Sequence, residues 1–437
     1  MIRIAGRCRD AARRSRARAL TPALEGLEDR KLLSTTNGGR WYFPNLITYS
    51  FVPDGTSIGG ISSDLFLKFD AIAPRVTWQA QFKKAAAIWQ QVAGINLAEV
   101  PDNGTPIGGT GNQQGDPYFG DIRIGGNAMG LGTLAFAALP PPLNGGSLAG
   151  DIVINTAQSW KVNNDYDMLT VAIHEFGHAL GMGHSAIQAA SMYGTYVWMK
   201  QSLNSDDISG IQSIYGTTKA DATPTNNVSS GAIDLTPLMD PQGRVVYGDG
   251  AITSLSNFEW YKVRVPDDNT TGTMTITMQS TGLSSLSPRL TVLSSPSIVY
   301  GQLTASNIYG ATVTLTVNGV SPGQYYYIRA AAAQNGPGSN GAFGLLINAG
   351  TSSISPVPPP PTAVGAVPDQ GGGTSPDSTG GRAFLPRFRR GRGFGHGHDG
   401  DDSVQVIKLG DTEAKVDFLY AKPGRFLRPS RFRFRRR

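Results

Sequence analysis

The sequence predicts an α+β domain followed by an all-β domain, and two patterns carry this prediction. Before residue 217, short alternating apolar segments are interleaved with longer segments in which apolar residues recur at helical spacing. Between residues 233 and 349, short alternating runs separated by turn residues follow one another. The 437-residue length fits two or three domains, and a composition rich in glycine and proline but low in charge is typical of β-rich domains joined by loose connectors.

Residues 1–40 are predicted to be a basic leader. The first 33 residues hold nine lysines and arginines against four acidic residues, with no apolar run long enough for a signal peptide or a membrane helix. LEDRKLL, at residues 27–33, resembles a short segment near the start of many large bacterial exported proteins, which implies a secreted, extracellular or cell-envelope location. A disordered basic leader is the alternative. Cys8 is the only cysteine, so the chain cannot form an intrachain disulfide.

Apolar periodicity predicts the elements of residues 41–217. Ile47, Tyr49 and Phe51 alternate as in a first strand, and a helix is expected over residues 77–93, ended by Gly94. Further elements are expected as strands at residues 95–100, 121–124, 134–138 and 151–155, and as a closing helix at residues 205–215 capped by Ser205 and ended by Gly216.

The segment VAIHEFGHALGMGH, residues 171–184, carries the functional prediction. On a helix, His174 and His178 project from one face and can reach a single metal ion. Glu175 lies beside the first ligand, where it can act as general base towards a metal-bound water. Gly181 can adopt a positive φ and turn the chain so that His184 approaches as a third ligand. Three imidazoles with an open fourth position indicate a catalytic zinc site, and three ordinary histidines on a buried helix are the alternative.

The full H-E-x-x-H-x-x-G-x-x-H spacing resembles that of the metzincin metallopeptidases and, within them, the matrixins. Met192, eight residues after His184 in ASMYGTY, resembles the family's Met-turn. The resemblance implies a metzincin catalytic domain at residues 41–217, with a twisted mixed sheet and three helices. It also implies one zinc held by the three histidines, with Glu175 as general base and acid and Met192 as a structural floor.

The same resemblance implies how a substrate would bind. Residues 132–140, GTLAFAALP, would border the cleft and pair with an extended polypeptide, which adds itself as another strand. The segment after Met192 would form the outer wall of an apolar S1′ pocket, with Gly194 where the family usually has proline. The substrate-binding residues implied in this way are Gly132, Thr133, Leu134, Ala135, Tyr193, Gly194 and Tyr196.

Two departures from the matrixin pattern bear on metals. Phe136 and Val153 stand where matrixins use ligands of a second, structural zinc, so that zinc is not expected. The acidic calcium ligands that follow the family's GD sequence are replaced by Asn155, Thr156 and Gln158, which leaves calcium open but doubtful. Apolar packing then has to hold the cleft strands.

Residues 218–232 form a polar linker, and residues 233–349 are predicted to fold as an antiparallel β-sandwich. The segments FEWYKVRVPDD and ATVTLTVNGVSPGQYYYIRA resemble the bacterial pre-peptidase C-terminal domain found after secreted peptidases. The tyrosines of this region could bind a polymer, but packing in the core and along sheet edges is the preferred interpretation.

The C-terminal part is predicted to be a disordered linker at residues 350–381 and a disordered basic tail at residues 382–437. The tail holds fifteen lysines and arginines against six acidic residues. Phenylalanines interleaved with arginine suit an anionic surface or polymer. Nucleic acid is the weaker candidate because no recognised nucleic-acid motif accompanies the tail, and a solvated tail without a single partner is the alternative.

Together these features predict a secreted zinc endopeptidase that acts on extended polypeptides, without a transmembrane segment and as a monomer. The alternative is a non-catalytic envelope or matrix binding protein that retains a metallopeptidase fold. Glu175 argues against it, because a degenerate site should lose its catalytic acid before its ligands. A third hypothesis is a self-processing adhesin that removes its leader or cuts its linker near residues 356–361.

Overall fold

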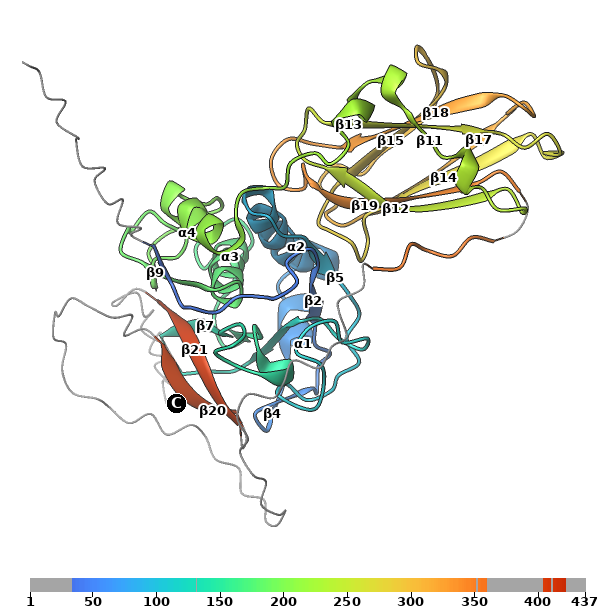
Figure 1. Cartoon of the computed structure of the whole chain (residues 1–437). Helices are drawn as coiled ribbons and strands as arrows, with labels where there is room; N and C mark the ends of the chain where they lie inside the picture. Colours follow the sequence, from blue (N-terminus) through green and yellow to red (C-terminus); the bar gives the residue numbers. More distant parts are fainter. Residues whose placement is uncertain (1–33, 131, 351–352, 360–403, 410–411, 422–437) are drawn as a thin grey trace, which may run out of the picture. The chain divides into compact units, whose positions relative to one another are not determined.

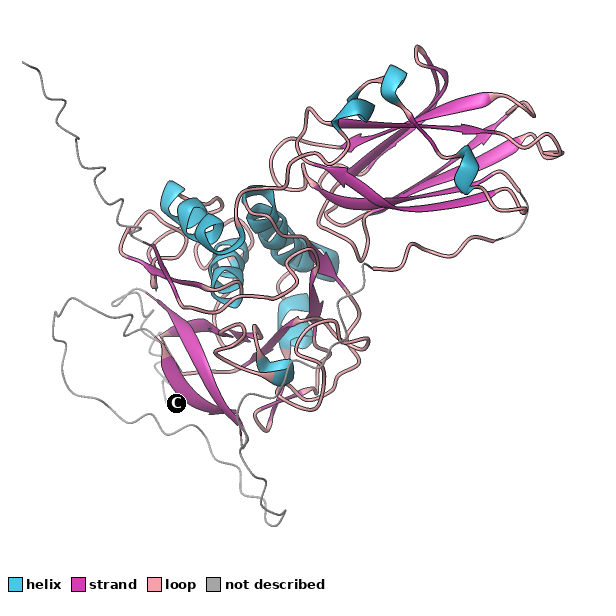
Figure 2. Ribbon diagram, viewed as in Figure 1, coloured by secondary structure: helices cyan, strands magenta, loops and turns pink. Residues whose placement is uncertain are grey.

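The computed structural model describes residues 34–130, 132–350, 353–359, 404–409 and 412–421. They form an α+β domain and a region of two β-sheets (Figures 1 and 2), so the predicted fold class is confirmed. Within these ranges no helix is both long enough and apolar enough to cross a membrane.

A mixed eight-stranded sheet forms the centre of the α+β domain. Its strands are β2 (Ile47–Phe51), β5 (Leu97–Glu99), β6 (Ile122–Asn127), β7 (Thr133–Ala138), β8 (Ile152–Asn155), β10 (Thr195–Tyr196), β20 (Gln405–Leu409) and β21 (Thr412–Ala421). The order is β10-β21-β7-β8-β6-β2-β5, and β20 pairs with β21 beyond this path. β2, β5, β6 and β8 pair in parallel, whereas β7 is antiparallel to both β8 and β21. Two small sheets pair β1 (Ser34–Thr36) with β9 (Met182–Ser185) and β3 (Ser57–Ile58) with β4 (Ile61–Ser62).

Four α-helices accompany this sheet, one more than the sequence predicted. They are α1 (Leu65–Asp70), α2 (Arg75–Val92), α3 (Met168–Ala179) and α4 (Ser205–Tyr215), and the 3-10 turn η1 (Gly146–Leu148) lies before β8. The short helix α1 was missed because six residues hold too few turns for helical periodicity to appear. The closing helix has the predicted bounds, but its cap is Asn204 rather than Ser205: the Asn204 side chain accepts from the Asp206 amide, and Asp207 completes a capping box.

The two long helices pack against the sheet through aromatic side chains. Trp89 of α2 donates to the carbonyl of Ile173 in α3 at 2.8 Å, which joins the two helices. Phe176 of α3 meets Tyr49 of β2 edge to face, with 5.6 Å between ring centroids. The aromatic residues predicted at helical and alternating spacing therefore form one core between helix and sheet.

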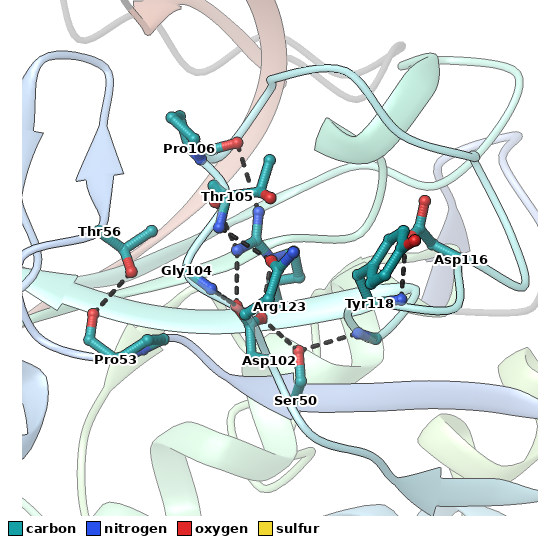
Figure 3. A network of polar contacts seen from close by, with 12 residues as sticks. Ser50, Pro53, Thr56, Asp102, Gly104, Thr105, Pro106, Asp116, Tyr118 and Arg123 are labelled. Atoms are coloured by element: carbon teal, nitrogen blue, oxygen red, sulfur yellow. Dashed lines mark hydrogen bonds and ion pairs between the residues drawn. The ribbon is translucent and has the colours of Figure 1, made fainter.

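A buried arginine holds the long loop between β5 and β6 (Figure 3). Arg123 of β6 is fully buried, and its Nε and Nη2 donate to the two carboxylate oxygens of Asp102 at 2.9 and 2.8 Å. Nη2 also donates to the carbonyl of Thr105 at 2.6 Å, and the hydroxyl of Ser50 donates to Asp102 at 2.7 Å. This bidentate pair replaces regular secondary structure as the anchor of the loop.

The second region consists of two sheets around a separate apolar core. Its elements are η2 (Pro224–Asn227), η3 (Ser229–Gly231), β11 (Ile233–Asp234), η4 (Thr236–Leu238), β12 (Arg244–Ile252), β13 (Phe258–Arg264), β14 (Thr273–Gln279), β15 (Pro288–Ser295), β16 (Ile298–Thr304), β17 (Thr312–Asn318), β18 (Tyr325–Ala332) and β19 (Gly341–Asn348). The sheet orders are β11-β13-β18-β15-β16 and β12-β19-β14-β17. Most neighbours are antiparallel, as predicted for a sandwich, and β11 pairs with β13 in parallel. The resemblance to a pre-peptidase C-terminal domain stays a prediction.

The prediction of a wholly disordered basic tail is wrong at β20 and β21. These strands form a hairpin that adds to the main sheet through β7. The tail as a whole is rich in arginine, but its segments VQVIKL and TEAKVDFLYA contain no arginine and show the alternation of strands. The Arg/Phe-rich segments on either side of the hairpin lie outside the described residues.

The start of the chain also joins this domain. Ser34–Thr36 pairs with Met182–Ser185, although residues 34–40 were predicted to belong to the leader. The basic segment of residues 1–33 lies outside the described residues.

Candidate active site

Helix α3 carries two of the predicted histidines and the predicted general base. The side chain of Asp167 caps the helix by accepting from the Thr170 amide at 3.0 Å, and the residues that follow are buried. Four residues apart, His174 and His178 face each other with 4.6 Å between ring centroids.

Gly181 turns the chain so that the third histidine reaches the same place. Its φ is 105°, and a Cβ atom there would lie 2.3 Å from the carbonyl oxygen of Gly39, so the turn requires glycine. The chain continues as β9, and the ring of His184 lies 5.3 and 4.8 Å from the rings of His174 and His178. Each of the three offers one ring nitrogen within 4.8 Å of those of the others.

The hydrogen bonds of His174 and His178 determine which ring nitrogen carries the proton and which is available to bind a cation. Nδ1 of His174 lies 2.7 Å from the carbonyl oxygen of Ser191, and Nδ1 of His178 lies 2.9 Å from that of Met182. Because a carbonyl only accepts, both Nδ1 atoms carry the proton and both Nε2 atoms present lone pairs. These two Nε2 atoms are 2.9 Å apart, a repulsive arrangement that a metal ion between them would relieve.

Burial favours the neutral, metal-binding form of His174. It lowers the pKa of His174 well below the ordinary range, and the two neighbouring imidazoles lower that pKa further. The donor set, the geometry and the tautomers therefore fit a metal such as zinc.

Glu175 lies beside this group as a buried carboxyl. Neither of its carboxylate oxygens has a hydrogen-bond partner within the described part of the chain. Burial raises the pKa of Glu175 well above its ordinary value, and the negative charge of Asp417 raises it further. An unpartnered buried carboxyl next to three imidazoles is suited to accept a proton.

Met192 is fully buried in the core against α3. A Cβ atom added at Gly177 would lie 2.2 Å from the Met192 sulfur and 2.9 Å from Trp89. The helix that carries the histidines thus rests directly on Met192, and the role of Met192 as a structural floor beneath a metal stays a prediction.

We expect Gly177→Ala to lower the free energy of unfolding by about 1–3 kcal/mol through overpacking against Met192. Helix propensity alone favours alanine by about 1 kcal/mol, so a destabilisation measured by urea unfolding isolates the steric conflict. Gly145→Ala is the control, because a Cβ atom there meets nothing within 4 Å. Equal stability of both variants would show that Met192 moves aside.

A pocket opens beside His174. Its lining residues are Thr170, His174, Ser191, Tyr193, Thr195, Tyr196, Trp198, Lys200 and Leu419. The predicted wall residues Tyr193 and Tyr196 are among them. Gly194 instead lies against the third histidine, since a Cβ atom there would be 2.9 Å from the His184 ring.

The predicted substrate-binding strand, β7, already pairs with another strand of the same chain. Thr133, Leu134 and Ala135 lie in β7, which pairs with β21 in the register Leu419↔Ala135. The amide of Ala421 donates to the carbonyl of Gly132 at 2.7 Å. Of the predicted site residues, His174, Tyr193 and Tyr196 line the pocket, and residues 132–135 lie along β21. Their roles in binding a substrate stay predictions.

Two residues of β21 belong to the site and were missed by the sequence reasoning. Leu419 lines the pocket, and the Asp417 carboxylate, 1% exposed, lies 3.5 Å from Nδ1 of His184 and 3.7 Å from Nδ1 of His178. The available signal was the alternation in TEAKVDFLYA, which indicates a strand but names no partner.

Comparisons with known proteins agree with this geometry. Residues 66–216 match the family model described as Matrixin. Karilysin of Tannerella forsythia is 41% identical over 86 residues, 20% of this chain and 18% of karilysin. Human matrix metalloproteinase-20 is 44% identical over 92 residues, 20% of this chain and 18% of that protein. The hatching enzyme of Paracentrotus lividus is 30% identical over 195 residues, 44% of this chain and 29% of that enzyme. The chain thus spans less than a third of the length of each of these relatives.

Proposed function

Residues 66–216 form a matrixin domain, and from this premise we propose that the chain is a secreted zinc endopeptidase that cleaves extended polypeptides. The observation that supports the proposal most is Glu175, a buried carboxyl without a hydrogen-bond partner in the described chain, beside three clustered imidazoles. A protein that used this fold for binding alone would have no need to keep a buried carboxyl there, since an unpaired buried acid costs stability.

His174, His178 and His184 would hold the zinc ion. When bound, zinc supplies Lewis acidity, which acidifies a water molecule and polarises the scissile carbonyl group. The chain's own contribution is to fix the imidazole tautomers through the carbonyl groups of Ser191 and Met182.

Glu175 transfers a proton from the attacking water to the leaving amine. Its carboxylate accepts a proton from the attacking water, and its raised pKa helps the carboxyl keep that proton until the leaving amine takes it up. No side-chain nucleophile is required.

The cleft orients the substrate. β7 pairs with β8 on one side and with β21 on the other, and an extended substrate would take the place of β21 as its antiparallel partner. The pocket bordered by Tyr193 and Tyr196 would receive the side chain that follows the scissile bond. Such backbone pairing makes binding tolerant of sequence, and the pocket provides selectivity. The proposed location outside the cytoplasm is supported by the segment LEDRKLL.

The test is cleavage of unfolded casein and a quenched peptide library by the full chain, with and without a zinc chelator. Because β21 lies along the cleft, a Leu419→Asp chain is assayed beside the wild type. We expect hydrolysis that stops with chelator and returns with added zinc. A folded, zinc-loaded Leu419→Asp chain without activity on any substrate would overturn the proposal in favour of the binding-protein alternative.

A further inference from the structure

We propose that strand β21 is an intramolecular inhibitor, which fills the cleft with the chain's own C-terminal hairpin and keeps substrate out. This inference rests on the proposed function, because it assigns the ligand of that same cleft.

The backbone of β21 is held from both sides. It pairs antiparallel with β7 and parallel with β10, so it lies between the predicted substrate strand and the wall of the pocket. The amide of Leu139 donates to the carbonyl of Lys415 at 3.0 Å, and the Asn144 side chain bonds both the amide and the carbonyl of Lys415 at 2.8 Å. An extended substrate that pairs with β7 would need the same edge.

Leu419 forms part of the wall of the proposed specificity pocket. Its side chain is 2% exposed and lines the pocket together with His174, Tyr193 and Tyr196. Burial of this apolar side chain stabilises the position of β21 and narrows the pocket available to a substrate side chain.

Asp417 brings a buried negative charge to the histidines. It lies two residues before Leu419 and so on the same face of β21, next to two of the three imidazoles. A cation bound by the histidines would favour this arrangement, because it would offset the buried negative charge of Asp417.

The opposite face of β21 covers an apolar patch on β7 and β8. Phe418 packs against Phe136 with 5.3 Å between ring centroids, and Val416 and Val153 belong to the same buried cluster. Phe136 and Val153 are the residues that stand where matrixins use ligands of the second zinc. These two departures from the family pattern thus form part of the surface on which the inhibitory strand packs.

The experiment compares full-length variants of β21 with a control on the same strand. Leu419→Asp places a charge in the pocket, Asp417→Asn removes the charge at the histidines with little change in size, and Glu413→Gln changes an exposed residue of β21. Hydrogen exchange of residues 133–139 reports the pairing of β7 with β21 without reference to activity. The visible spectrum of the cobalt-loaded chain reports whether the Asp417 carboxylate lies at the metal.

We expect Leu419→Asp to speed hydrogen exchange in residues 133–139. We also expect it to raise kcat/KM on a quenched peptide by about tenfold or more, because a larger fraction of the molecules has β21 displaced and can bind substrate. Asp417→Asn should change the cobalt spectrum and raise kcat/KM, and Glu413→Gln should change neither exchange, spectrum nor rate. A synthetic peptide of residues 404–421 should inhibit the Leu419→Asp chain and leave the wild type unaffected. Inhibition by the added peptide would show that Leu419→Asp acts by displacing β21 from β7. A variant whose fold is damaged would not be inhibited in this way.

Three results would contradict the proposal that β21 is an inhibitor. One is unchanged exchange in Leu419→Asp with full hydrolysis already in the wild type, which leaves the peptidase proposal standing. A second is cleavage of the chain's own Phe418–Leu419 bond, which would make β21 a substrate. The third is faster hydrogen exchange in residues 133–139 without hydrolysis by any metal-loaded variant. That result would contradict the proposed peptidase function as well, and β21 would then have a structural role only.

Discussion

Replacing Glu175 with glutamine is expected to lower kcat on an extended peptide by about 10²- to 10⁴-fold, the usual contribution of a positioned general base. The amide keeps the size of the side chain but cannot accept a proton at neutral pH. It also removes a buried carboxyl without a hydrogen-bond partner in the described chain, so the variant should be at least as stable as the parent. The comparison is made in the Leu419→Asp background, where the cleft is expected to be open, and zinc content is measured by elemental analysis.

Glu413→Gln in the same background is the matched control, because it makes the same chemical change at an exposed position of β21. It should leave kcat within experimental error of the parent. A Glu175→Gln chain that binds one zinc ion and keeps its rate would assign the proton transfer to another group, and Asp417, which lies beside His178 and His184, would be examined next.

The largest effect on stability is expected from Asp102→Ala, which should lower the free energy of unfolding of the α+β domain by about 3–5 kcal/mol. The substitution leaves the guanidinium of Arg123, fully buried on β6, without its charged partner. It also removes the acceptor for the hydroxyl of Ser50. Urea unfolding followed by tryptophan fluorescence measures the effect.

Glu99→Ala is the control for this substitution, since the pair of Lys83 and Glu99 is about one third exposed. Exposed ion pairs contribute about 0–1 kcal/mol, so this variant should stay close to the wild type. A loss below about 1 kcal/mol for Asp102→Ala would mean that water reaches Arg123 and replaces the carboxylate.

The sequence was most informative where local spacing decides geometry. The i, i+4 histidines, the glycine turn and the third histidine all lie in 14 residues, so the motif itself brings them together, and the structure places them as expected. Strands β2, β5, β7 and β8 were found within about two residues for the same reason, because alternation is a local signal, whereas β6 runs three residues beyond its predicted end.

The sequence failed where geometry depends on distant partners. Nothing in TEAKVDFLYA shows that it pairs with β7, almost 300 residues earlier in the chain, because strand pairing leaves no mark in one sequence beyond alternation. Composition also misled, since the arginines on both sides concealed a short strand-forming segment. Phe136 and Val153 were recognised as departures from the family, but the side chains that cover them could not be inferred.

The pairing of β1 with β9 sets a limit on maturation at the N-terminus. The hydroxyl of Thr35 donates to the carbonyl of His184 at 3.1 Å, and the Asn37 side chain donates to the carbonyl of Met182 at 3.2 Å. These contacts brace the strand that carries the third histidine. Removal of the residues up to 40 would therefore remove both contacts and loosen the strand that carries His184, whereas a cut before Ser34 would keep them. Residues 34–37 thus belong with the folded domain rather than with the predicted leader.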